Sequence, residues 1–220
     1  MRIGVLALQG AFREHRQALH DLGVETVEVR RPQDLAGLDG LVIPGGESTT
    51  IRMLMAEYGL LSVLRDRIRE GFPVLGTCAG MIVLADRVDG SLADGLEGLD
   101  ISVRRNAFGR QVDSFEADLP VAALGAEPFH AVFIRAPVVE GVDSNVDVLA
   151  ELDDGRIVAV RQGSVVGVAF HPEMTKDRRF HQYFLDIVAR TQNQEDPRVE
   201  REQIAVPAGE HARRAGNARP

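Results

Sequence analysis

Pro73-Val74-Leu75-Gly76-Thr77-Cys78-Ala79-Gly80 is the stretch that decides how the fold of this 220-residue chain is interpreted. It passes from a short apolar run into a turn flanked by two glycines, and an apolar helical pattern follows from Met81 to Ala85. An apolar run without alternation is typical of a strand buried on both faces, as in a parallel sheet. The stretch therefore predicts a buried strand, a tight turn and a helix in succession.

The residues before this stretch repeat the same alternation. Apolar runs predict strands over residues 3–8, 24–29 and 40–43, and the patterns between them predict helices over residues 11–22, 48–58 and 61–69. Strands and helices that alternate at this spacing favour βαβ units. We therefore expect an α/β fold whose parallel sheet carries helices on both faces.

Beyond Arg87 short β-like runs and tight turns replace this alternation. The candidate strands are residues 101–104, 111–116, 131–135, 146–152, 157–161 and 165–170. We expect them to form an antiparallel extension of the same domain, followed by a final helix over residues 177–189. The domain is predicted to span residues 1–190. Residues 191–220 are polar, balanced in charge and poor in large apolar side chains, so we expect a disordered tail.

The composition excludes several classes of function. Lys and Arg number 25 against 33 Asp and Glu, a net charge of −8, whereas a nucleic-acid surface needs a basic footprint. The single cysteine cannot form an internal disulfide, and no charged start leads into an apolar secretory segment. No apolar run reaches the ~18 residues that a membrane span needs. We expect a soluble, cytoplasmic globular protein with no nucleic-acid or membrane partner.

Cys78 lies between Gly76 and Gly80, which is the pattern of a nucleophile elbow, G-x-S-x-G, with cysteine in place of serine. The glycines permit the cramped turn that holds a nucleophile at an exposed tip. A helix that begins at Ala79 directs free N–H groups and the positive end of its dipole at the sulfur, which favours the thiolate. A lone cysteine in an apolar setting can also be inert filler, but the two matching glycines favour a nucleophile.

The segment His171-Pro172-Glu173 follows the last predicted strand. A cysteine nucleophile needs a base, and the base needs a third group to fix its tautomer. His171 and Glu173 can project the same way from a strand end, although a His-Pro pair can also be simple turn chemistry. No cluster has the spacing of zinc ligands, so we expect no metal. The remaining histidines are interpreted as surface or structural residues: His15, His20, His130, His181 and His211.

A glycine-rich loop, Pro44-Gly45-Gly46-Glu47-Ser48-Thr49-Thr50, joins the third predicted strand to a helix. Ligands bind to such loops at the carboxyl ends of parallel strands, and glycine N–H groups can donate to an oxyanion or a carboxylate. The alternative is that the glycines only form the turn and Ser48 or Thr49 caps the helix. The Walker pattern is absent, which disfavours phosphate-loop ATPase chemistry.

These three windows, in this order and at these separations, resemble the triad-type (class I) glutamine amidotransferases. The narrower resemblance, from residue 1 to about residue 190, is to the glutaminase subunits of pyridoxal 5'-phosphate synthases. It implies a flavodoxin-like fold, a three-layer α/β sandwich with a mostly parallel central sheet, which agrees with the order of strands and helices above. Further segments that carry the resemblance are Leu8-Gln9-Gly10, Arg105-Asn106, residues 108–116 and Phe133-Ile134-Arg135-Ala136.

The resemblance implies that L-glutamine is hydrolysed to L-glutamate and ammonia without a cofactor. The ammonia passes to a separate synthase subunit, in a large hetero-oligomer that makes pyridoxal 5'-phosphate (vitamin B6). By matching position, Cys78 is the nucleophile, His171 the general base and acid, and Glu173 the orienting carboxylate. The residues that match the glutamine-binding segments are Gly46, Glu47, Ser48, Arg105, Ile134 and Arg135.

Two further expectations concern activation of the site. The oxyanion donors are expected to be the backbone N–H groups of Gly46 and Ala79. Gln9 follows the first predicted strand and should lie on the same rim of the sheet, where we expect the synthase subunit to dock.

Two other functions compete with this interpretation. A cysteine peptidase on the same fold would share the elbow and the histidine, and a binding module with Cys78 as a redox sensor would need neither His171 nor Glu173. Arg105 and Arg135 favour an amino-acid substrate, because a guanidinium can grip its α-carboxylate. The residues alone predict a cysteine-dependent acyl-transfer enzyme; glutamine and the vitamin product come from the resemblance.

Overall fold

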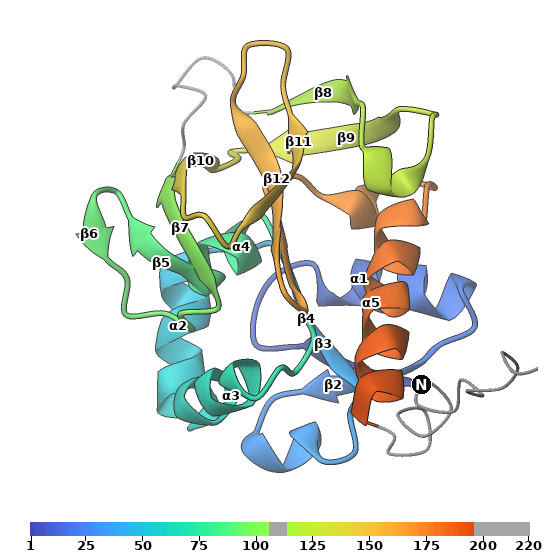
Figure 1. The fold of residues 1–220 in the computed structure, drawn as a ribbon. Coiled ribbons are helices and arrows are strands. Elements are labelled where there is room, and N and C mark those ends of the chain that lie inside the picture. The colour runs from blue at the N-terminus through green and yellow to red at the C-terminus, as the bar shows by residue number, and fades with distance from the viewer. Residues whose placement is uncertain (106–113, 196–220) are drawn as a thin grey trace, which may run out of the picture.

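One large sheet runs through the computed structural model, which describes residues 1–105 and 114–195, and helices cover both of its faces (Figure 1). The predicted fold class, a flavodoxin-like three-layer α/β sandwich with a mostly parallel central sheet and an antiparallel extension, is confirmed. The division of the chain at residue 190 stays a prediction.

The half of the sheet that contains the N-terminus consists of five parallel strands. All residues of β3, β4 and β13 are buried, as expected of apolar strands covered on both faces. Because parallel strands end at the same edge of a sheet, the loops that follow them lie together there. In spatial order the strands are β2 (Glu25–Val29), β1 (Arg2–Leu6), β3 (Gly40–Ile43), β4 (Val74–Thr77) and β13 (Val165–Val168).

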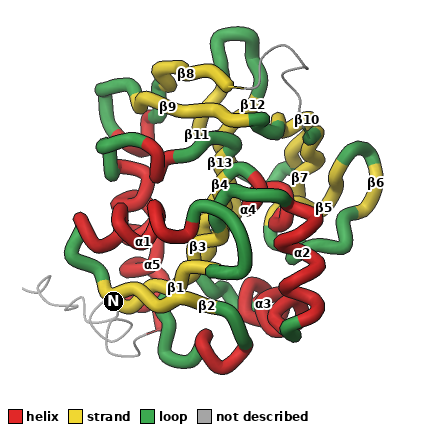
Figure 2. The backbone as a smooth tube through the Cα atoms, turned by 180° about the vertical axis from the view of Figure 1, so that it is seen from behind, coloured by secondary structure: helices red, strands yellow, loops and turns green. Residues whose placement is uncertain are grey.

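The helices form the two outer layers, with α1 and α5 on one face of the sheet and α2, α3 and α4 on the other (Figures 1 and 2). Each turns an apolar stripe inward; in α3 the buried side chains Leu60, Leu64 and Ile68 recur every fourth residue. No helix within the described residues is both long and apolar enough to cross a bilayer. The helices are α1 (Phe12–Asp21), α2 (Ser48–Glu57), α3 (Leu60–Arg69), α4 (Ala79–Leu84) and α5 (Arg179–Glu195), with 3-10 turns η1 (Pro32–Leu35), η2 (Ala122–Leu124) and η3 (Pro172–Met174).

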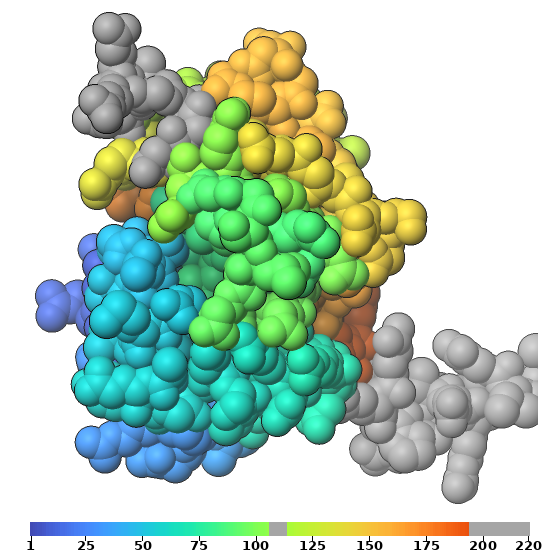
Figure 3. Space-filling model, turned by 90° about the vertical axis from the view of Figure 1, so that its left-hand side faces the viewer, coloured from blue at the N-terminus to red at the C-terminus, as the bar shows by residue number. Residues whose placement is uncertain are grey.

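The predicted antiparallel extension continues the sheet beyond β13. Residues 165–170 were expected to belong to this extension, but β13 pairs in parallel with β4 and only its other edge, toward β12, is antiparallel. Neighbouring strands there are antiparallel, apart from the parallel pair β5 and β7. In the side view of Figure 3 this region lies above α2 and α3, and Asp94 after β6 binds Arg52 of α2 and Arg65 of α3. The strands are, in order, β12 (Ile157–Gln162), β10 (Val138–Val142), β7 (Leu99–Arg104), β5 (Ala85–Val88) and β6 (Ser91–Leu92), while β11 (Asp147–Glu151) pairs with the other edge of β12.

Two of the strands expected in the extension do not join the large sheet. Strands β8 (Ser114–Leu119) and β9 (Phe129–Ile134) pair only with each other, as a separate two-stranded sheet. Aromatic packing explains this, because Phe115 stacks on Phe133 within the pair, and Phe129 packs edge-on against Phe180 of α5 at 4.8 Å between ring centroids. The start of the predicted strand, residues 111–113, lies outside the described residues.

Other boundaries also differ from those predicted. The structure contains three strands that the sequence does not predict, β5, β6 and β10. Strand β6 has only two residues, and the pairing of β10 with β7 is interrupted by a register shift after Val139. Helix α5 starts at Arg179, where Asp177 accepts the backbone N–H of that residue, and continues to Glu195, six residues past the predicted end. The rest of the predicted tail, residues 196–220, lies outside the described residues.

Candidate active site

Cys78 occupies a strained turn between β4 and α4. Its backbone has φ 49° and ψ −105°, a conformation that non-glycine residues rarely adopt and that is found mainly at functional sites. The flanking glycines are required by the packing. A Cβ at Gly80 would lie 2.1 Å from the carbonyl oxygen of Ile43, and one at Gly76 would lie 2.7 Å from the carbonyl carbon of Gly80. The predicted elbow is therefore present as a close-packed turn.

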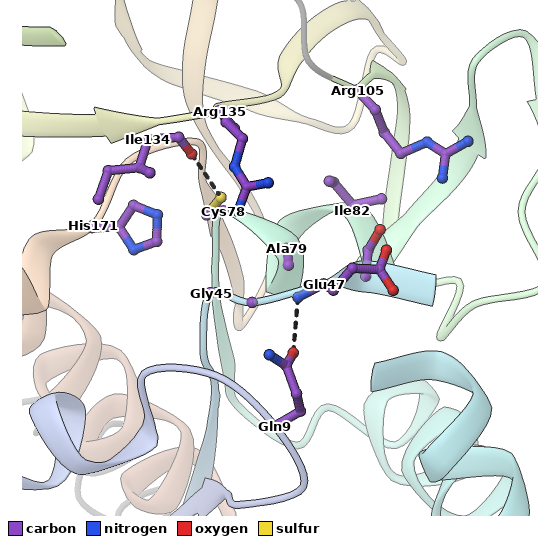
Figure 4. A pocket seen from close by; sticks show the side chains of 12 residues that line it. Gln9, Gly45, Glu47, Cys78, Ala79, Ile82, Arg105, Ile134, Arg135 and His171 are labelled. Carbon is purple, nitrogen blue, oxygen red and sulfur yellow. Dashed lines mark hydrogen bonds between the residues drawn. The ribbon is translucent and has the colours of Figure 1, made fainter. Parts of the chain in front are cut away.

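Strands β9 and β13 bring the second predicted segment beside this turn. The backbone N–H of Cys78 donates to Val168 at the end of β13, and the N–H of His171 donates to Val132 of β9 at 2.9 Å. The sulfur of Cys78 lies 3.8 Å from the carbonyl oxygen of Ile134, and the ring of His171 lies beside it (Figure 4). Cys78 as a whole residue is 6% exposed and lines the pocket, so the thiol is accessible from the pocket without lying on the outer surface.

His171 and Glu173 form a buried pair. Nδ1 of His171 lies 2.7 Å from Oε1 of Glu173, which leaves Nε2 as the ring nitrogen free to serve Cys78. Burial acts to lower the pKa of His171, but its interactions with Cys78 and Glu173 outweigh burial and raise the pKa to about 10. Burial likewise opposes ionisation of Glu173, while His15 and His171 hold the pKa of its carboxyl group below the usual value. The pair is thus arranged to stabilise an imidazolium beside the sulfur.

The glycine-rich loop is held in place by the segment after β1. The N–H of Ala11 donates to the carbonyl of Gly45 at 3.0 Å, and the N–H of Glu47 donates to Oε1 of Gln9 at 2.8 Å (Figure 4). A Cβ at Gly10 would lie 1.9 Å from the oxygen of Gly45, so this close approach requires glycine there. Gln9 thus lies on the predicted rim, in direct contact with the loop.

Helix α2 is capped by a residue other than the two considered in the sequence. The carboxylate of Glu47, rather than the hydroxyl of Ser48 or Thr49, accepts the backbone N–H groups of Thr49 and Thr50. The hydrogen bond from the Thr50 hydroxyl also lowers the pKa of Glu47. The longer side chain reaches back over the first turn and satisfies two otherwise unpaired donors. The Glu47 carboxylate is therefore engaged in capping.

A pocket of about 370 Å³ joins the three segments, at the lower end of the range of small-ligand sites (Figure 4). The sequence-predicted residues that line it are Gln9, Gly46, Glu47, Ser48, Cys78, Ala79, Arg105, Ile134, Arg135 and His171. Glu173 is the exception among the predicted site residues, since it lies behind His171, to which it is bonded.

The two predicted carboxylate-binding arginines differ in their surroundings. Arg105 binds Asp89 through both its backbone N–H and its Nε, so part of its guanidinium is already paired. Arg135 has a positive φ of 43° at the end of β9, and within residues 1–105 and 114–195 its side chain has no ion-pair partner. Arg135 is thus the cation more available to a ligand. Asn106 and most of the segment 108–116 lie outside the described residues.

Two histidines near the site were missed by the sequence analysis. His15 and His181 are fully buried behind Glu173, which agrees with the second of the two alternatives, surface or structural, that the sequence left open for them. His15 lies on the inward stripe of α1 with Ala18 and Leu19, three and four residues later, and this spacing is the signal that could have placed it inside. Its contact with Glu173, however, depends on tertiary packing.

Comparisons with known proteins agree with one another. The SNO glutamine amidotransferase family matches residues 5–190 of the chain. The chain is 58% identical over 188 residues to the pyridoxal 5'-phosphate synthase subunit PdxT of Clavibacter sepedonicus, covering 84% of this chain and 90% of that protein. It is 56% identical over 187 residues to the protein of the same name from Roseiflexus sp. (strain RS-1), covering 84% and 99%. A structure described as "Crystal structure of glutamine amidotransferase" matches with a TM-score of 0.80 and 52% identity, over 85% of this chain and 98% of that one.

Proposed function

This chain belongs to the SNO glutamine amidotransferase family, and from that premise we propose that it hydrolyses L-glutamine through a Cys78–His171–Glu173 triad and delivers the ammonia to a synthase subunit. As with the relatives named pyridoxal 5'-phosphate synthase subunit PdxT, we assign the chain as the glutaminase subunit that serves vitamin B6 synthesis.

One observation carries the triad: a strained cysteine and a buried, carboxylate-bound histidine open into the same pocket. The 2.7 Å contact with Glu173 fixes the proton of His171 on Nδ1, so Nε2 is the atom that takes the proton of the thiol. The raised pKa of His171 favours the imidazolium–thiolate form of the pair.

The reaction then has two halves. The Cys78 thiolate attacks the side-chain amide carbon of glutamine, and the proton on His171 Nε2 passes to the leaving nitrogen as the carbon–nitrogen bond breaks. Ammonia leaves and a γ-glutamyl thioester remains on the sulfur. Water, deprotonated by the same nitrogen, attacks the thioester, and glutamate departs as the thiolate and the imidazolium are restored.

The oxyanion needs donors beside the sulfur, and we assign them to the backbone N–H groups of Gly46 and Ala79. The carbonyl of Gly45 is turned toward Ala11, to whose N–H it is bonded. Because a trans peptide directs its N–H opposite to its C=O, the N–H of Gly46 is turned away from Ala11. A single such donor is typically worth ~2.7–4 kcal/mol in the transition state.

The substrate glutamine would be held by its α-carboxylate at the arginines of the pocket, with its side-chain amide at Cys78. Arg135 grips the α-carboxylate as a charge-assisted partner, with Arg105 as a second cation at the same wall. Glu47 contributes its backbone to the wall of the pocket, because its carboxylate caps α2. Ser48 and Ile134 complete the substrate-binding surface.

We assign the docking site of the synthase subunit to the edge of the sheet where Gln9 lies. Through its contact with the N–H of Glu47, Gln9 links this rim to the loop that supplies the Gly46 donor. Docking that fixes this loop would strengthen a transition-state contact, so stimulation is expected mainly in kcat.

The test is ammonia release from L-glutamine, measured with and without the synthase subunit, beside a panel of peptide substrates. We expect glutamine turnover, stimulated about tenfold or more by the partner, equivalent to ~1.4 kcal/mol, and no peptide cleavage. Gly46→Ala, whose Cβ would lie 2.3 Å from Oε1 of Gln9, should blunt the stimulation. Peptide cleavage without glutamine turnover would contradict the proposal in favour of a peptidase.

A further inference from the structure

A chain of buried polar side chains continues behind the triad, on the side away from the pocket. Nε2 of His15 lies 3.2 Å from Oε2 of Glu173, the carboxylate oxygen that His171 does not use, and 3.0 Å from Oγ1 of Thr77. Nδ1 of His15 lies 3.0 Å from Nε2 of His181. Thr77, His15 and His181 have no exposed surface, so these contacts are shielded from bulk solvent.

The positions of the protons follow from the partners of each nitrogen. Burial lowers the pKa of His15, and it lowers the pKa of His181 to about 3, so both rings are neutral and each carries one proton. One proton lies between His15 Nδ1 and His181 Nε2. If His15 supplied it, the lone pair on its Nε2 would face the Glu173 carboxylate, and the proton of His181 would lie on Nδ1, which has no hydrogen-bond partner among the described residues.

The opposite assignment satisfies more groups. With its proton on Nε2, His181 donates to His15 Nδ1, and His15 then carries its proton on Nε2, facing Glu173 Oε2 and Thr77 Oγ1. Only the lone pair on His181 Nδ1 stays unpartnered, and a buried acceptor without a partner is tolerated better than a buried donor. Nε2 of His15 is hydrogen-bonded to Thr77, and its 3.2 Å contact with Oε2 is electrostatic, because Oε2 has no hydrogen-bond partner within the described residues.

We propose that His15 is a positioning residue for the triad, one whose Nε2–H, hydrogen-bonded to Thr77, also places partial positive charge 3.2 Å from the second oxygen of Glu173. This rests on the proposed function, in which Glu173 orients His171. A buried carboxylate with one bare oxygen would rotate or take up a proton, and either change would release Nδ1 of His171. His15 on α1 thus keeps the Glu173 carboxylate ionised and oriented toward the ring of His171.

Two other charged groups have smaller effects on the pKa of His15. Glu14, beside it on α1, raises the pKa of His15, and Arg178, before α5, lowers it. The Arg178 guanidinium is itself bound to Asp21 of α1 at 2.8 Å. The groups that face the His15 ring directly are thus Glu173 and His181, with His171 across the carboxylate.

The test compares two substitutions that keep a different nitrogen of the ring. In His15→Gln the side-chain amide can reach the place of Nε2, whereas in His15→Asn it can reach only the place of Nδ1. We expect His15→Gln to stay within about threefold of the wild-type kcat and His15→Asn to lose about tenfold or more, ~1.4 kcal/mol, with KM for glutamine nearly unchanged in both. The acidic limb of the kcat/KM profile should move to higher pH in His15→Asn alone, because the Glu173 carboxylate is then easier to protonate.

The matched control is His20→Gln, the same change on the exposed face of the same helix, which should leave both kinetic constants and the pH profile unchanged. Equal effects of His15→Gln and His15→Asn, or a better asparagine variant, would overturn the proposal. If either His15 variant fails to fold by circular dichroism, His15 serves the core and the proposal is also overturned. Cys78→Ala in the same assay distinguishes failure of the His15 proposal from failure of the proposed triad, because activity in that variant would refute the triad itself.

Discussion

The closest steric constraint on the proposed triad is at Gly45, and Gly45→Ala tests it. A Cβ at this position would lie 2.4 Å from Cε1 of His171 and 3.3 Å from Cβ of Cys78. The φ of Gly45 is outside the left-handed region, so alanine fits the backbone there and the change acts through the side chain alone. The methyl group therefore competes with the imidazole for the same space.

The expected loss follows from this overlap. Non-bonded carbon atoms approach to ~3.5–4.0 Å, so the ring of His171 must move by about 1.1 Å or more. A displacement of ~1 Å in a catalytic group can cost about 10²-fold in rate, or ~2.7 kcal/mol in the activation barrier. We expect kcat for ammonia release to fall by this order.

The control is the same substitution at Gly141 in β10, where a Cβ would meet Cβ of Ser102 at 4.0 Å, an ordinary contact. Gly141→Ala should keep the wild-type kcat, and both variants should keep a cooperative thermal unfolding transition. A Gly45→Ala variant with more than about half of the wild-type kcat would refute the placement of His171 as the catalytic base.

Three further outcomes are expected. His171→Ala should lose about tenfold or more activity beyond Glu173→Gln, because the base moves protons while the carboxylate orients it; the reverse order in kcat would exchange their roles. Gly80→Ala should lower the free energy of unfolding by about 1–3 kcal/mol in urea, because its Cβ would lie 2.1 Å from a backbone oxygen; an unchanged midpoint would contradict the close packing of the elbow. Burial lowers the pKa of His181 from 6.5 to about 3, so stability is complete above pH 6.5 and falls in acid, by about 2 kcal/mol between pH 7.5 and 5; His181→Leu should remove this part of the pH dependence, and an identical slope would show that His181 is not its source.

Most of the parallel half of the fold could be predicted because its signals are local. Strands β1, β3 and β4 are short, largely apolar runs followed by a turn that contains glycine, and buried parallel strands need no more than that. The parallel pairing of β13 with β4 could not be predicted, because it joins segments about 90 residues apart. The elbow is equally local, since the glycines at 76 and 80 and the cysteine between them specify the strained turn. These residues predict a nucleophile before any tertiary contact is known.

What could not be predicted depends on contacts between distant segments. His15 and Glu173 are separated by 158 residues, and only the packing of α1 beside η3 brings them together. The separation of β8 and β9 from the large sheet follows from aromatic contacts with Phe180, far along the chain. The capping of α2 by Glu47 was missed because Ser, Thr, Asp and Asn are the residues favoured at that position, and a longer carboxylate reached the same donors.

Active-site labelling by a glutamine-analogue alkylator, followed by peptide mapping, examines the proposed nucleophile itself. We expect one label per chain, on the peptide that contains Cys78, with ammonia release lost in proportion to labelling and L-glutamine protecting the site. Cys78→Ala should take up no label and release no ammonia. Full glutaminase activity in completely labelled protein, or in the alanine variant, would contradict the assignment of Cys78 as the nucleophile.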